Sequence, residues 1–185
     1  MPMTDFDQLL DDVAARAPLA LPFGHTSLRA PASAEEVARA EAALGFTLPP
    51  LLVDLYTRVA DGGFGPESGL FPLLDDNGRG PSAVSSYLAR RSGGEADGWA
   101  WPEAVLPIAD WGCYMLACVD CRDDDAAVLL FEPNSAAPEF AWYVDAPRLA
   151  GWLREWLDGT AWYCTTDDVE EDMAPWPYYR ARTGR

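Results

Sequence analysis

The sequence predicts an α+β fold, with a mainly antiparallel sheet flanked by helices. Helical periodicities dominate the first half of the chain, and short apolar runs with strand character follow in the second half. One further amphipathic helix comes after these runs. An order of helices, then strands, then a helix favours α+β over the alternating pattern of α/β domains.

The first two helices have clear boundaries. Apolar residues at helical spacing predict a helix over residues 5–17, which Pro18 ends. Ser33 and Glu36 form a capping-box pattern that opens a second helix. That helix runs to residue 44, and Gly45 is its C-terminal stop.

The next helix begins at Leu48-Pro49-Pro50, because proline is well tolerated in the first helical turn. It ends at the turn Asp61-Gly62-Gly63. Residues 70–74 predict a short strand, and residues 83–91 predict a short helix.

Four strands follow, over residues 105–109, 113–120, 127–131 and 140–145. The second and third are apolar on both faces, which is typical of central strands. The fourth alternates more cleanly and is predicted at an edge. A strong helix then starts at Pro147 and stops at Gly159, with Trp152 and Trp156 on its apolar face.

The charge balance excludes several functions. The chain has 185 residues, 30 of them acidic against 13 basic, for a net charge of −17. It contains no lysine and a single histidine, His25, so lysine chemistry and multi-histidine metal sites are excluded. Nucleic acids and anionic membranes need a basic surface, so neither is an expected partner. The acidity fits either solubility or a basic protein partner.

The segment from Ala32 to Gly65 resembles the opening signature of the SUKH superfamily, Smi/Knr branch. In that signature an inward Glu precedes Leu-Gly, Leu-Pro opens a second helix, and a Gly-Gly turn ends it. The corresponding residues here are Glu41, Gly45, Pro49, Gly62 and Gly63, with Trp152 and Trp156 in the last helix of the pattern.

The resemblance spans roughly residues 32–159. It implies a SUKH-like fold with a curved antiparallel sheet, and a cytoplasmic, non-enzymatic bacterial immunity protein. Residues 1–31 would add an N-terminal helix and loop packed on the domain, and residues 160–185 an acidic, aromatic tail. The sequence also lacks an apolar stretch long enough for a membrane helix and a basic segment typical of a signal peptide.

The sequence gives only weak signals for metal binding, cofactor binding or catalysis. Cys118 and Cys121 have the spacing of a zinc knuckle, but a closed zinc site needs a second pair. We therefore expect no metal, no cofactor and no catalytic residue, with the cysteines as packing or turn thiols. Glu41 lies near an apolar helix face, so we expect backbone amides or an arginine to bind its carboxylate.

Acidic loops and aromatic residues outside the main helices are the candidate partner-binding residues, because such aromatics often dominate protein interfaces. They are Asp75, Asp76, Trp99, Trp101, Trp111, Asp123, Asp124, Asp125, Trp162, Asp167, Asp168, Glu170, Glu171 and Trp176.

The sequence thus favours a domain that neutralises a bacterial polymorphic toxin by occluding a basic surface. One alternative is an interaction adaptor or regulator without a toxin partner. A more remote alternative is a small-molecule-binding protein or a hydrolytic enzyme, although no nucleophile–base pair is recognisable.

Overall fold

A computed structural model describes residues 5–21, 26–75, 80–93, 100–134, 137–164 and 173–184. Its centre is a four-stranded antiparallel sheet in the order β1-β2-β3-β4. The strands are β1 (Val105–Gly112), β2 (Met115–Asp120), β3 (Val128–Phe131) and β4 (Trp142–Ala146). The central position of β2 and β3 and the edge position of β4 agree with the hydrophobic patterns of these segments.

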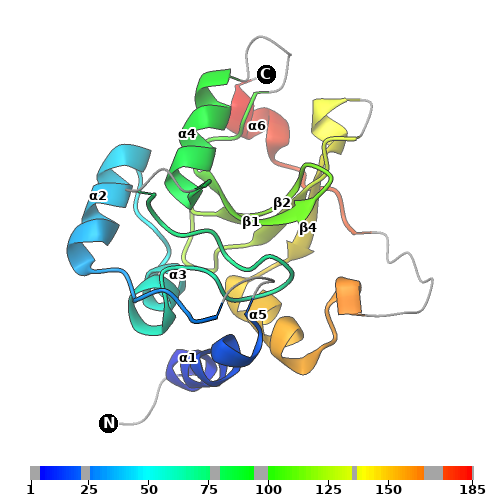
Figure 1. The fold of residues 1–185 in the computed structure, drawn as a ribbon. Helices are drawn as coiled ribbons and strands as arrows, with labels where there is room; N and C mark the ends of the chain where they lie inside the picture. The colour runs from blue at the N-terminus through cyan, green and yellow to red at the C-terminus, as the bar shows by residue number, and fades with distance from the viewer. Residues whose placement is uncertain are drawn as a thin grey trace.

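Helices cover both faces of this sheet (Figure 1). The α-helices are α1 (Asp5–Arg16), α2 (Ala34–Leu44), α3 (Pro50–Asp54), α4 (Ala83–Gly93), α5 (Leu149–Asp158) and α6 (Tyr179–Thr183). Shorter helical turns are η1 (Ala17–Leu19), η2 (Leu55–Val59), η3 (Pro138–Phe140) and η4 (Trp162–Cys164). In Figure 1, α4 and α6 lie above the sheet, whereas α5 lies below it with α1 beneath. The predicted α+β class is confirmed.

The helix ends follow the local sequence. The capping box is formed, because Glu36 N donates to Ser33 Oγ at 3.2 Å and Ser33 N donates to Glu36 Oε2 at 2.7 Å. Gly45 and Gly159 adopt left-handed conformations at the C-caps of α2 and α5. Helix α5 begins at Leu149, two residues later than predicted from Pro147.

Two strand predictions need correction. The segment 70–74 forms only an isolated bridge, between Leu70 and Ala109. Strand β2 begins at Met115 rather than at Cys113, because Cys113 and Tyr114 have φ angles of 50° and 67°. Left-handed residues form the tight turn between β1 and β2 and cannot continue the pleat.

The described part of the C-terminal segment is integrated into the fold. Trp176 and Tyr179 are buried against the hydrophobic core. Val144 N donates to Ala174 O at 2.8 Å, and Trp176 N donates to Trp142 O at 2.9 Å. These bonds run along β4, so the segment covers an otherwise open sheet edge.

The N-terminal helix α1 packs beside α5 and η2. Its buried residues are Leu9, Leu10 and Val13, and Asp12 pairs with Arg154 at 2.6 Å. Among the described helices, none is long and apolar enough to cross a membrane.

Candidate partner-binding surface

The signature residues have structural roles that hold the backbone in place. Glu41 Oε1 accepts a hydrogen bond from Leu48 N at 2.8 Å, which confirms the predicted backbone-amide partner. This bond ties α2 to the start of the next helix, at the residue before Pro49. Glu41 is therefore occupied by an intramolecular contact.

The turn after η2 is fixed by its own residues. Asp61 Oδ1 accepts a hydrogen bond from Leu73 N at 2.7 Å, and Arg29 Nε donates to Asp61 Oδ2 at 3.2 Å. Gly62 has a φ of 71°, and a Cβ atom there would lie 2.5 Å from Phe71 O. Only glycine fits such a close approach of two backbone segments.

The two tryptophans of α5 are part of the core, as their helical spacing predicts. Trp152 and Trp156 are both buried, and Trp152 Nε1 donates to Asp145 Oδ2 at 3.0 Å. This bond joins α5 to β4.

Two of the candidate partner-binding tryptophans, Trp101 and Trp176, are buried in the folded chain. Only 5% of Trp101 and 4% of Trp176 is exposed. Trp101 Nε1 donates to Val105 O at 2.7 Å, and its ring packs at 4.9 Å from that of Trp142. A large ring next to an apolar sheet gains more free energy by burial than by exposure, even in an irregular segment.

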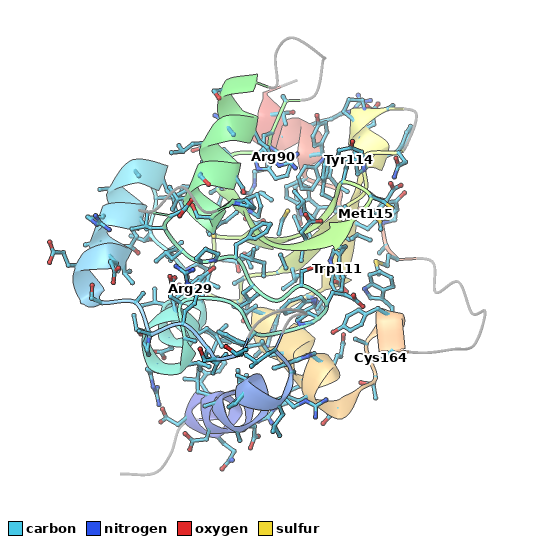
Figure 2. The ribbon with its side chains drawn as sticks, in the orientation of Figure 1. Arg29, Arg90, Trp111, Tyr114, Met115 and Cys164 are labelled. Atoms are coloured by element: carbon cyan, nitrogen blue, oxygen red, sulfur yellow. The ribbon has the colours of Figure 1, made fainter. Side chains whose placement is uncertain are left out.

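Trp111 and Trp162, by contrast, come together at the end of β1. Their ring centroids are 5.4 Å apart, and the Tyr163 ring lies 4.7 Å from Trp111 and 5.5 Å from Trp162. All three residues are partly exposed. We call Trp111, Trp162 and Tyr163 the aromatic cluster; in Figure 2 it lies where Trp111 faces the turn that carries Cys164.

The aromatic cluster contains two buried donors, Trp111 Nε1 and Tyr163 Oη, that have no hydrogen-bond partner within the described residues. Burial raises the pKa of Tyr163, and the nearby Cys164, Asp145, Glu155 and Glu67 raise it further. The ring therefore stays a neutral donor, with carboxylates around it.

Asp145 belongs to the same region. Burial raises its pKa to about 6, against the opposing effect of the hydrogen bonds from Trp152 and Trp162. Sequence reasoning did not single out Asp145 or Tyr163. The adjacency of Tyr163 to Trp162 was the only signal, since the approach of Trp111 is set by the fold.

The predicted acidic residues in turns have mainly local roles. Asp123 Oδ1 accepts from Ala126 N at 3.1 Å, Asp125 pairs with Arg148 at 3.4 Å, and Asp75 Oδ2 accepts from Gly80 N at 3.3 Å. Asp124 is exposed in the β2–β3 turn. The remaining candidates lie outside the described residues: Asp76, Trp99, Asp167, Asp168, Glu170 and Glu171.

All four cysteines are free thiols, with Cys118 buried, Cys121 partly buried, and Cys113 and Cys164 exposed. Cys118 and Cys121 lie on β2 and in the following turn. In the described ranges, no three His, Cys, Asp or Glu side chains are grouped as metal ligands.

Comparison with known proteins agrees with this description of the fold. The sequence model of the SMI1/KNR4 family (SUKH-1) matches residues 31–155, which include the capping box, the Gly62 turn, the sheet and most of α5. No curated protein sequence matches the chain. The family match covers more than half of the chain, and the protein therefore belongs to the SMI1/KNR4 family (SUKH-1).

Proposed function

We propose that this protein is an immunity-type protein-binding domain that neutralises a basic toxin domain by covering its surface. The family is generally non-enzymatic, and membership is consistent with a protein-binding role. The signature residues Glu41, Asp61 and Gly62 support this proposal, because all three serve the backbone rather than a reaction centre.

The aromatic cluster is the observation that carries the proposal. Partly exposed tryptophan and tyrosine rings are the residues that most often dominate binding free energy at interfaces. The donors Trp111 Nε1 and Tyr163 Oη are buried, so they would bind carbonyl oxygens of the partner only after the rings shift on docking. An arginine or lysine of the partner would stack on these rings and approach the carboxylates of Asp145 and Glu155.

The charge of the whole chain favours the same kind of partner. A net charge of −17 attracts a basic protein over long range and speeds its association. The aromatic cluster would then slow dissociation, because the contacts that a ring makes are short-ranged and need close packing. The exposed carboxylate of Asp124 and the acidic candidates outside the described residues would extend the negative face.

The test is co-expression with a basic toxin domain, taken from whichever neighbouring gene encodes one. We expect growth to be restored and a complex to be isolated by size-exclusion chromatography at low salt. Trp111→Ala should weaken binding about 30-fold, as for a hot-spot residue worth about 2 kcal/mol. Phe140→Ala is the matched control, because Phe140 is an exposed ring on η3, before β4, and is not part of the aromatic cluster.

Two results would contradict the proposal. One is unchanged toxicity without a complex. The other is a complex that Trp111→Ala and Phe140→Ala weaken equally, which would place the contact surface elsewhere. Circular dichroism of each variant separates a lost contact from a lost fold.

A further inference from the structure

A cavity of about 460 Å³ lies on the face of the sheet opposite α5. Helix α4 contributes its last turns, and strands β3 and β4 form the floor. Figure 2 shows Arg90 and Tyr114 close together in the upper part of the molecule, whereas Cys164 lies lower down. The lining side chains used below are Arg90, Trp101, Tyr114, Phe131 and Trp142.

The walls of the cavity are aromatic. The Trp101 ring lies 5.0 Å from Phe131 and 4.9 Å from Trp142, and Phe131 and Trp142 are 4.7 Å apart. Trp142 Nε1 is also a buried donor without a hydrogen-bond partner in the described part of the chain. A flat apolar body with an acceptor atom would match both features.

Arg90 provides the only guanidinium among the described lining residues. Its Cζ atom lies 4.8 Å from the centre of the Trp101 ring and 5.5 Å from that of Phe131. Within the described ranges Arg90 forms no ion pair with a carboxylate. Other arginines of this acidic chain do so: Arg29, Arg58, Arg122, Arg148, Arg154, Arg180 and Arg182.

The environment of Arg90 is unfavourable for a cation without a counter-ion. Burial lowers the pKa of Arg90, because the guanidinium has lost part of its hydration, and the nearby Cys118 and Asp110 oppose this effect without forming an ion pair with it. The two aromatic faces replace some of that hydration. A bound anion would replace more of it, since a charge-assisted hydrogen bond is stronger than a neutral one.

Tyr114 stands at the edge of the cavity. It has a φ of 67°, which is rare for a bulky side chain, and 81% of it is exposed. The left-handed conformation costs about 1 kcal/mol. The strained turn keeps an aromatic ring beside the opening, where it gains little from burial in the protein itself.

We propose that this cavity is a binding site for a planar aromatic carboxylate. The carboxylate would pair with the Arg90 guanidinium, and the flat ring would pack among Trp101, Phe131 and Trp142 beneath Tyr114. The volume lies within the range of small-molecule sites, about 300 to 1,000 Å³. The site is separate from the aromatic cluster, so it does not depend on the proposed function.

The probe for this site is 2-naphthoate, titrated into the full-length protein by isothermal calorimetry. Its uncharged analogue 2-naphthamide and the cation 2-naphthylmethylamine have the same ring system. We expect one-to-one binding of 2-naphthoate, about tenfold weaker binding of the amide, and no binding of the amine.

Variants locate the bound probe. Arg90→Met keeps the apolar stem and removes the charge, and should weaken 2-naphthoate binding about tenfold or more. Arg122→Met is the matched control, because Arg122 pairs with Glu103 at the other end of β2 and should leave affinity unchanged. Tyr114→Ala changes an exposed side chain without disturbing the core, and should weaken binding even if Arg90→Met fails to fold.

Several outcomes would overturn the assignment. These are no binding of 2-naphthoate at about 1 mM, equal binding of the three probes, or unchanged affinity in both Arg90→Met and Tyr114→Ala. Binding of an acidic peptide that requires Arg90, without binding of 2-naphthoate, would assign the cavity to a protein partner instead.

Discussion

Arg182 of α6 and Asp120 of β2 form the most buried ion pair among the described residues, with a nitrogen–oxygen distance of 2.5 Å and exposed side-chain fractions of 11% and 8%. Arg182 Nη1 also donates to Glu103 O at 3.3 Å, and Glu103 N donates to Arg182 O at the same distance. Helix α6 is therefore held by an ion pair to the end of β2 and by hydrogen bonds to the segment before β1. The family match ends at residue 155, before α6 begins.

Loss of this ion pair should destabilise the whole domain. Arg182→Met leaves the Asp120 carboxylate buried without its cation, and we expect the free energy of unfolding to fall by about 3 kcal/mol. Arg180→Met is the control, because the Arg180–Glu139 pair is exposed to solvent and its loss should change stability little. Urea denaturation measures both. Equal effects of the two substitutions would contradict this assignment.

The sequence predicts the helix ends and the central strands correctly, because their signals are local. The capping box at Ser33 and the glycine at position 45 act within a few residues of the chain. The burial of Trp101 and Trp176 has no such signal, since both lie in irregular segments and are buried by contacts with Trp142 and its neighbours. The turn at Cys113 was missed because the apolar alternation continues through it.

The candidate sites, too, could be predicted from the sequence only in part, because tertiary packing brings their residues together. Trp111 and Trp162 can be named as aromatic candidates from the sequence, but their approach at 5.4 Å depends on the packing of η4 against β1. Arg90 carries no sequence signal at all, because an arginine in the last turn of a helix is ordinary. Its significance comes from the aromatic walls around it, which three separate segments supply.

Gly62 and Gly45 offer a matched comparison, since both have positive φ angles and only Gly62 is crowded. Gly45→Ala should cost about 1 kcal/mol, the usual penalty for a left-handed alanine. Gly62→Ala adds a clash with Phe71 O and should cost about 3 kcal/mol or more. Thermal or urea unfolding of both variants tests the difference, and similar losses would show that the turn adjusts easily.

The four thiols should divide into two classes. Cys113 and Cys164 are exposed and should react quickly with an aromatic disulfide reagent in the native protein. Burial raises the pKa of Cys118 and of Cys121, so these two should react only after unfolding. Mass spectrometry of the labelled peptides identifies each site. Rapid native labelling of Cys118 would mean that the sheet opens far more readily than its packing indicates.

Asp145 should make stability depend on pH in the direction opposite to a salt-bridged carboxylate. Its pKa is about 6 in the folded chain and about 3.9 when unfolded, so between these values the folded state binds the extra proton. The stabilisation that Asp145 contributes is present below about pH 4 and is lost as the pH rises through 6.

Asp145→Asn keeps an acceptor for Trp152 Nε1 and cannot titrate. The stability of this variant relative to the unmodified chain should increase by about 1 to 2 kcal/mol from pH 4 to pH 7, after allowance for the partial exposure of the carboxylate. Urea denaturation across that range measures the difference, and a constant difference would show that Asp145 titrates normally. Because the same carboxylate lies beside the aromatic cluster, its protonation at low pH should also weaken binding of a basic partner.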